Sequence, residues 1–182
     1  MRILQLDVNN IKYKLIEPES KVYEKSDEKE KSVDDAIVLL VSIESGDTAE
    51  DAHEAINEAV KFMKQIKRKR LVIYPFAHLS NNLEKPEKAL EILNEMRKSV
   101  PKEIELISAP FGWNKSLSLD IKGYPLAEQS KGFGISAKRN AKPSEEKSAE
   151  KEAKGSEKEE VSEALKQEEK VKSTWYILDV DG

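Results

Sequence analysis

The sequence predicts an α/β (α+β) domain in which a mixed β-sheet packs against two helices. Two amphipathic helix patterns each follow a short apolar strand pattern, and further strand patterns precede and follow these two units. The residues that could fill a core lie mainly in residues 1–133, whereas residues 134–174 contain no Phe, Trp or Tyr. A core of about 130 residues is large enough to fold alone.

The first residues predict two strands that form a hairpin. Residues 1–7 are mostly apolar, and residues 11–16 alternate apolar side chains with lysines, as in a strand with one buried face. Asn9 and Asn10 lie between the two patterns and are typical of a turn. Residues 18–34 are polar and predict a loop.

The first strand–helix unit follows this loop. Residues 36–43 are apolar and rich in β-branched side chains, which predicts a strand buried on both faces. Thr48 and Asp51 resemble a capping box at the start of a helix, with Asp in place of the usual Glu. The apolar face of this helix contains Ala52, Ile56, Ala59, Val60, Met63 and Ile66.

The second unit begins with a strand at residues 70–74, and Pro86 suits the first position of the helix that follows. The apolar stripe of this helix contains Ala89, Leu90, Leu93 and Met96. Residues 103–109 and 115–121 predict two more strands, and residues 124–132 form either a short strand or an irregular segment. The predicted order is therefore two strands, two strand–helix units, and two or three strands.

The remaining residues predict a linker and the beginning of another domain. Residues 137–172 contain acidic and basic residues in equal number and very few apolar ones. Such a segment cannot bury a core, so we expect a charged linker that is disordered or partly helical. Residues 173–182 have a strand pattern and end in Asp-Gly, so we expect a truncated start of a following domain. The first domain then spans residues 1–136.

Composition narrows the classes of function. The formal net charge is -4, so any contact with RNA would be local, and the clearest basic run is at residues 67–70, where cations also suit a helix end. The chain has no cysteine, which excludes disulfides and thiolate chemistry. It has no signal peptide and no apolar run of roughly 18 residues, so we expect a cytoplasmic protein that does not enter a membrane.

Three candidate site residues follow predicted strands or the turns between them. His78 comes directly after a buried strand, where ligand sites of α/β sheets gather, although a histidine there can also be structural. Lys115 follows the rigid segment APFGWN and could point into a cleft or into solvent. Glu128 is the only carboxylate of the segment GYPLAEQSK and could equally be a surface residue.

The common catalytic motifs are absent from the sequence. There is no Gly-rich phosphate loop, no HExxH, no cluster with the spacing of metal ligands and no G-x-S-x-G nucleophile elbow. A hydrolase built on this chain would therefore activate water directly or use a group of its own substrate.

Several segments together resemble the amino-terminal editing domain of archaeal threonyl-tRNA synthetases, which shares its fold with D-aminoacyl-tRNA deacylases. These segments are MRIL at 1–4, YPFAHLS at 74–80, Lys85-Pro86, APFG at 109–112, Lys115 and KGYPLAE at 122–128. They cover about the first 130 residues in the right order. The resemblance implies a deacylase-like fold of order β2-(βα)2-β3, which agrees with the order read from the hydrophobic pattern.

The resemblance also implies a function, the proofreading hydrolysis of mischarged L-seryl-tRNA(Thr). One methyl group is worth only about 1–3 kcal/mol in a pocket, so a second site must remove serine that is attached by mistake. By similarity, Lys115, His78 and Glu128 are expected to be catalytic. The residues expected to bind substrate are Val41, Ser42, Ile43, Pro75, Phe76, Ala77, Phe111, Gly112, Trp113 and Asn114.

The resemblance implies assistance by the 2′-hydroxyl of the terminal adenosine, and no metal or cofactor in this domain. Its expected partner is the 3′ end of tRNA(Thr) carrying serine. A homodimer is compatible with the resemblance, and so is association with a threonyl-tRNA synthetase catalytic subunit. ATP and zinc are expected only if a synthetase core follows.

Two alternatives and two departures from the family pattern stay open. The alternatives are a D-aminoacyl-tRNA deacylase, which residues 173–182 disfavour because they imply a following domain, and a non-catalytic tRNA-binding module. Asn114 stands where the family has an aromatic residue before the lysine, and Asp7 stands where the opening strand has a histidine. These departures concern the shape of the pocket and leave its main-chain framework unchanged.

Overall fold

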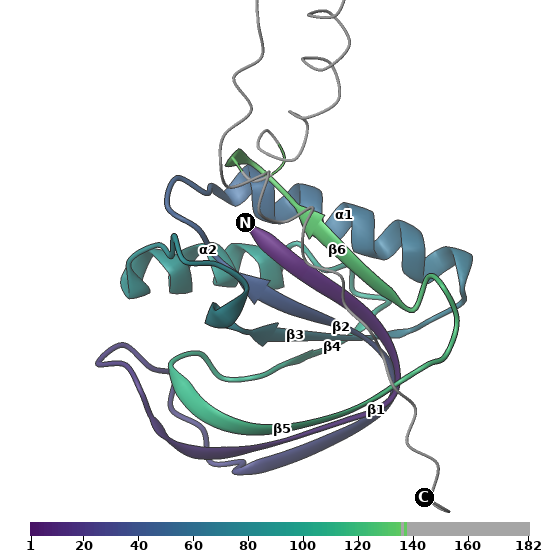
Figure 1. Ribbon diagram of the computed structural model, residues 1–182, viewed down its shortest axis with the longest axis horizontal. Coiled ribbons are helices and arrows are strands. Elements are labelled where there is room, and N and C mark those ends of the chain that lie inside the picture. The colour runs from purple at the N-terminus through teal and green to yellow at the C-terminus, as the bar shows by residue number, and fades with distance from the viewer. Residues whose placement is uncertain (136, 138–182) are drawn as a thin grey trace, which may run out of the picture. The chain divides into compact units, whose positions relative to one another are not determined.

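The computed structural model describes residues 1–135 and 137, and these form a six-stranded mixed sheet with two helices (Figure 1). Strands β2 (Glu30–Ser42), β3 (Arg70–Pro75) and β4 (Glu105–Ser108) are parallel neighbours. The predicted fold class is confirmed. The predicted linker beyond residue 137 and the predicted start of a following domain lie outside the described residues.

The antiparallel part of the sheet is built around β1 (Arg2–Pro18). One edge of β1 pairs with β2, and β5 (Trp113–Ile121) and β6 (Glu128–Gly132) also pair with β1, each along a different part of its length. The strand order is therefore β4-β3-β2-β1-β5, with β6 beside the first residues of β1.

The first strand is a single strand, so the prediction of a hairpin with its turn at Asn9 and Asn10 was wrong. The ladder with β2 continues through Asn10, which lies opposite Asp34. The Asn10 amide donates hydrogen bonds to Ser32 Oγ (2.9 Å) and Asp34 Oδ1 (2.7 Å), so its polar side chain is satisfied across strands and not in a turn. The register with β5 shifts at this point, and β1 bends strongly (Figure 1). The actual hairpin joins β1 to β2, which begins at Glu30, inside the predicted loop.

Both helices cover the same face of the sheet. Helix α1 (Ala49–Gln65) begins with the predicted capping box, because Thr48 and Asp51 each bind the other's amide. Helix α2 (Pro86–Lys98) begins with proline, as predicted. Neither of these helices is long and apolar enough to cross a lipid bilayer. The core under them includes Ile37, Leu39, Ile56, Met63, Leu71, Ile73, Leu93 and Met96.

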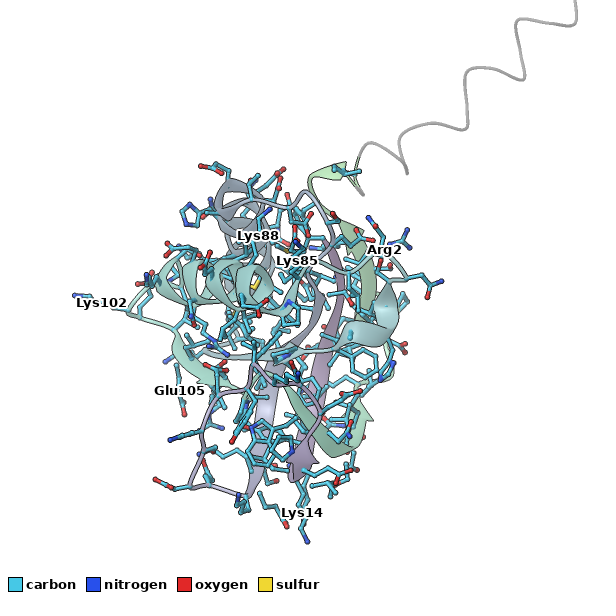
Figure 2. The ribbon with its side chains drawn as sticks, turned by 90° about the vertical axis from the view of Figure 1, so that its left-hand side faces the viewer. Arg2, Lys14, Lys85, Lys88, Lys102 and Glu105 are labelled. Atoms are coloured by element: carbon cyan, nitrogen blue, oxygen red, sulfur yellow. The ribbon has the colours of Figure 1, made fainter. Side chains whose placement is uncertain are left out.

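The other face of the sheet is covered by the strands themselves. Strands β1, β2 and β5 curl over it, and Figure 2 shows Lys14 far along this curled part, well away from Lys85 and Lys88 at the start of α2. The core on this face includes Leu6, Ile11, Tyr13, Val38, Leu40, Val72 and Tyr74, with Trp113 and Leu117 packed against it. The curl brings the first residues of β5 close to the carboxyl ends of β2 and β3.

Candidate active site

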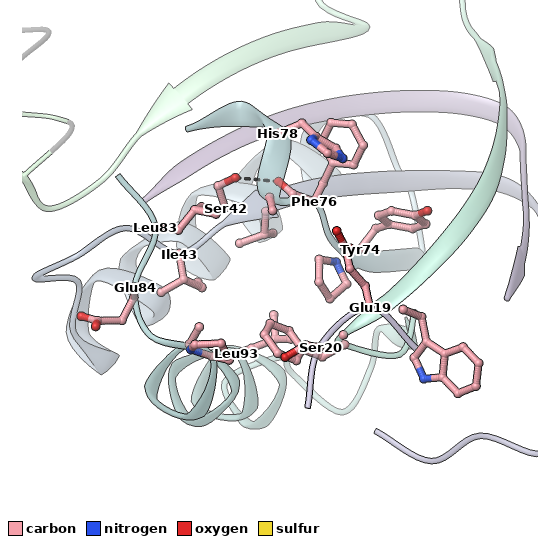
Figure 3. Close-up of a pocket in the computed structure, with 18 of the residues that line it drawn as sticks. Glu19, Ser20, Ser42, Ile43, Tyr74, Phe76, His78, Leu83, Glu84 and Leu93 are labelled. Carbon is pink, nitrogen blue, oxygen red and sulfur yellow. Dashed lines mark hydrogen bonds between the residues drawn. The ribbon is translucent and has the colours of Figure 1, made fainter. Parts of the chain in front are cut away.

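A cavity of about 290 Å³ lies at the carboxyl ends of β2 and β3 (Figure 3). Ligand pockets usually have roughly 300–1,000 Å³, so this one suits a small ligand or the end of a larger one. The lining residues come from five parts of the chain: Glu19 and Ser20; Val41–Ile43; Tyr74–His78; Leu83, Glu84, Pro86, Ala89 and Leu93; and Phe111–Lys115.

The chain after β3 is fastened to the end of β2. Pro75 ends β3 opposite Val41, and the next amide, that of Phe76, donates to the Val41 carbonyl (2.8 Å). The Ser42 hydroxyl then donates to the Phe76 carbonyl (2.6 Å), as Figure 3 shows. These bonds fix the point at which the backbone turns into a short 3-10 helix, η1 (Ala77–Leu79). The turn presents His78 at the edge of the cavity.

His78 is exposed on η1 and lines the cavity. Its imidazole lies edge-on to the Phe76 ring, with 5.2 Å between the ring centroids (Figure 3). The ring therefore has a fixed apolar neighbour on one side and access to water on the other. A neutral imidazole in this position can donate one hydrogen bond and accept another.

Lys115 reaches the cavity from β5, whose alternate residues face the curled interior. Its Nζ atom donates to the carbonyls of Pro110 (2.9 Å) and Trp113 (3.2 Å), and it lies 5.0 Å from the centroid of the Tyr74 ring. An ammonium group has three N–H donors. Two of them hold Lys115 in place, which leaves the third for a ligand.

The protonation of Lys115 is unusual for a lysine. Burial lowers its pKa to about 8, although the carboxylates of Glu19 and Glu24 attract the cation and oppose this change. The ammonium therefore predominates below about pH 8, and the neutral amine predominates above it. At neutral pH the cavity contains a partly desolvated positive charge, which interacts more strongly with a ligand than a charge in water would.

The cavity brings together most of the residues singled out from the sequence. His78, Lys115 and every residue predicted to bind substrate line it. Asn114 also lines the cavity but is exposed, because alternation in β5 turns its side chain away from the curled interior of the sheet. Glu19 and Ser20 could not be predicted from local patterns, since they reach the cavity only through the packing of the connection between β1 and β2. The structure gives the positions of these residues, and their catalytic and binding roles remain predictions.

Glu128 does not belong to this cavity. It is exposed on β6, opposite Leu6 of β1, and Leu6 lies opposite Val38 of β2. Val38 is four residues before Ser42, which corresponds to roughly 13 Å along a strand. The resemblance placed Glu128 beside His78 and Lys115, but the pairing of β6 with the first residues of β1 holds it at another part of the sheet.

Asp7 binds the segment that precedes β6, residues 122–127. It is fully buried, and Arg68 binds both of its carboxylate oxygens through Nε and Nη2 (3.0 and 3.1 Å). The Tyr124 hydroxyl also donates to Asp7 (2.6 Å), and the Asp7 main chain bonds with Lys122 and Ala127. Asp7 is not among the residues that line the cavity. Asp7, which stands where the resemblance implies a histidine, therefore belongs to a structural ion-pair network.

Comparison of the sequence with known proteins gives a match over most of the chain. Residues 1–133 match the family described as the archaea-specific editing domain of threonyl-tRNA synthetase. The chain is 37% identical over 183 residues to threonine–tRNA ligase from Nitrosopumilus maritimus, and 36% identical over 189 residues to the one from Pyrococcus furiosus. Both alignments cover 100% of this chain but only 27% of the relative, so the chain spans about a quarter of these proteins.

Comparison of the structure gives more distant matches. A probable eukaryotic D-amino acid tRNA deacylase has a TM-score of 0.47 and is 11% identical, over 67% of this chain and 94% of that one. The c-Myc DNA unwinding element binding protein has a TM-score of 0.52 and is 13% identical, over 72% of this chain and 98% of that one. The latter likeness shows a common fold and nothing about activity.

Proposed function

Because this chain belongs to the family of archaea-specific editing domains of threonyl-tRNA synthetase, we propose that it hydrolyses the ester between serine and the 3′ end of tRNA(Thr). The observation that carries the proposal is the convergence of His78 and Lys115 on one cavity, His78 from the 3-10 helix after β3 and Lys115 from the beginning of β5. Serine and threonine differ by one methyl group, and a single pocket cannot separate them well enough for translation. A second, hydrolytic site removes the error.

The end of the tRNA would enter the cavity from the side of α2. Main-chain groups of residues 41–43 and 75–78 would hold the terminal adenosine and the amino acid. Lys85 and Lys88 lie at the start of α2 (Figure 2), close to the cavity residues Glu84 and Pro86. Cations at such a rim favour the phosphates that lead out of the cavity. Lys88 is already paired with Glu84 (3.0 Å), so Lys85 is the better candidate for a phosphate contact.

The proposed reaction is attack of one water molecule on the carbonyl carbon of the seryl ester. Attack forms a tetrahedral intermediate, whose oxyanion the remaining N–H of the Lys115 ammonium would stabilise. His78 would orient the water by accepting one of its protons in a hydrogen bond. Collapse breaks the bond between the carbonyl carbon and the 3′-oxygen, and the neighbouring 2′-hydroxyl would supply a proton to that oxygen. The proton that the attacking water loses would pass through His78 to the 2′-oxygen and restore its hydroxyl. The products are free serine and a terminal adenosine with both hydroxyls, and the steps require no cofactor.

Deacylation by the 182-residue chain tests this proposal. The chain is incubated with tRNA that carries L-serine, L-threonine or a D-amino acid, and release is followed above the spontaneous rate of each ester. We expect rapid release of L-serine and little release of the other two. Preferential release of D-amino acids would identify a D-aminoacyl-tRNA deacylase instead, and release of nothing would identify a non-catalytic tRNA-binding module.

A further inference from the structure

The wall of the cavity that holds Lys115 is itself held by a glutamate far away in the sequence. Glu24 lies in the connection between β1 and β2, and its carboxylate accepts hydrogen bonds from Arg97 Nη1 (2.6 Å) and Nη2 (2.8 Å). The same carboxylate accepts a hydrogen bond from the Phe111 amide (2.7 Å). The Glu24 side chain therefore joins three segments: the loop between β1 and β2, helix α2, and the turn between β4 and β5.

Main-chain groups of Glu24 and Glu19 add further hydrogen bonds between the β1–β2 loop and the turn between β4 and β5. The Glu24 amide donates to the Phe111 carbonyl (3.1 Å), and the Glu24 carbonyl accepts from Trp113 Nε1 (2.7 Å). The Gly112 carbonyl accepts from the Glu19 amide (2.9 Å). Gly112 has a φ of 77°, and a Cβ atom there would lie 2.4 Å from the Val22 carbonyl oxygen. The two backbones are therefore in direct contact, and only glycine fits between them.

The turn that Glu24 binds, residues 110–113, also binds the Lys115 ammonium. Nζ of Lys115 bonds to the carbonyls of Pro110 and Trp113, which stand on either side of Phe111 and Gly112. We propose that Glu24 is a positioning residue for the active cavity, which fixes these two carbonyls and thereby the direction of the Lys115 ammonium. This inference rests on the proposed function for its effect on the rate, and on the geometry alone for its effect on Lys115.

The charge of Glu24 acts in the same direction as its hydrogen bonds. Burial alone would raise the pKa of Glu24, but the bonds from Arg97 and the Phe111 amide outweigh burial, so the pKa lies below its ordinary value. A charged Glu24 attracts the Lys115 ammonium and so helps to keep it protonated. The other ionisable groups that line the cavity with Lys115 are those of Glu19, Tyr74, His78 and Glu84.

The test compares the parental chain with Glu24→Gln, which keeps the size of the side chain but removes its charge and its paired bonds to Arg97. The titration of Lys115 is followed by NMR of its ¹³C-labelled ε-carbon, and its signal is identified by its loss in Lys115→Met. We expect a titration midpoint near pH 8 in the parental chain and at lower pH in the variant. The rate of serine release at saturating enzyme is expected to fall about tenfold, because the Lys115 ammonium stays in the cavity but points in another direction. The enzyme concentration that gives half of the maximal rate is expected to change little.

Glu105→Gln is the matched control, because Glu105 also binds an arginine, Arg70 Nε (2.9 Å), but is exposed and outside the cavity. It is expected to leave the midpoint and the rate unchanged. A folded Glu24→Gln chain with the parental midpoint, or with the parental rate at saturation, would overturn the inference. If the parental chain releases no serine, the proposed function fails, and the midpoint of Lys115 still decides the role of Glu24.

Should Glu24→Gln fail to fold, Arg97→Lys keeps the charge of Glu24 and its bond to the Phe111 amide but removes the paired fork. Slower release of serine by this variant, with the parental midpoint of Lys115, would support the inference. The parental rate at saturation would overturn it.

Discussion

Replacing Lys115 by methionine is expected to slow the release of serine from seryl-tRNA(Thr) by about 10²–10³-fold, which is the usual cost of removing one oxyanion donor. Methionine is close to lysine in length and can fill the same space over Tyr74, but it offers no N–H group to the reacting carbonyl. Because burial disfavours the ammonium, its removal is not expected to lower the temperature of thermal unfolding. The substitution is therefore expected to lower the rate of serine release and to leave the stability of the fold unchanged.

Single-turnover deacylation and thermal unfolding of the same preparation check this expectation. Lys14→Met is the matched control, because Lys14 is exposed on β1 opposite Ser116 and does not line the cavity. This control is expected to release serine at the parental rate. A folded Lys115→Met chain that does the same would show that the ammonium has no part in the reaction.

Removing the 2′-hydroxyl of the terminal adenosine is expected to slow enzymatic release by about 10²–10⁴-fold, the usual contribution of a positioned proton donor or acceptor. The side chains at the cavity include His78 and Lys115, and neither donates a proton to the leaving 3′-oxygen in the proposed reaction. That proton comes from the substrate in the proposed reaction. The measurement uses seryl-tRNA whose serine is on the 3′-oxygen of a 2′-deoxyadenosine.

Spontaneous hydrolysis also depends on the 2′-hydroxyl, so each enzymatic rate is divided by the spontaneous rate of the same ester. Binding of the deoxy substrate is measured separately and is expected to stay within a few-fold of the parental substrate. Full acceleration of the deoxy ester would contradict assistance by the ribose and would transfer the role of proton donor to a side chain.

Local patterns in the sequence were sufficient for the elements that depend on local chemistry. Thr48 and Asp51 predicted a helix start that the structure contains, and Pro86 predicted another. The apolar run in β2 predicted a strand buried on both faces, because no other environment suits so many adjacent apolar side chains. The pair Asn9 and Asn10 did not form the predicted turn, because the Asn10 side chain bonds across strands when a neighbouring strand is present.

The candidate site could be predicted only in part, and the reason is that it is assembled from distant segments. His78 follows a buried parallel strand, and this position carries a general expectation of function. Lys115 and Glu128 were linked to it by resemblance alone, and the strand pairing of β6 separates Glu128 from the other two. Glu24 gave no signal, because its importance depends on contacts with Arg97 and Phe111, which are far away in the sequence.

The most direct test is to locate the seryl end of the substrate in a structure of the 182-residue chain. An adenosine that carries serine through a 3′-amide resists hydrolysis and reproduces the bonds that the cavity would recognise. We expect this compound between residues 41–43 and 75–78, with its carbonyl oxygen within hydrogen-bond distance of Lys115 Nζ. Binding elsewhere, for example in the groove between the start of α1 and α2, would contradict it.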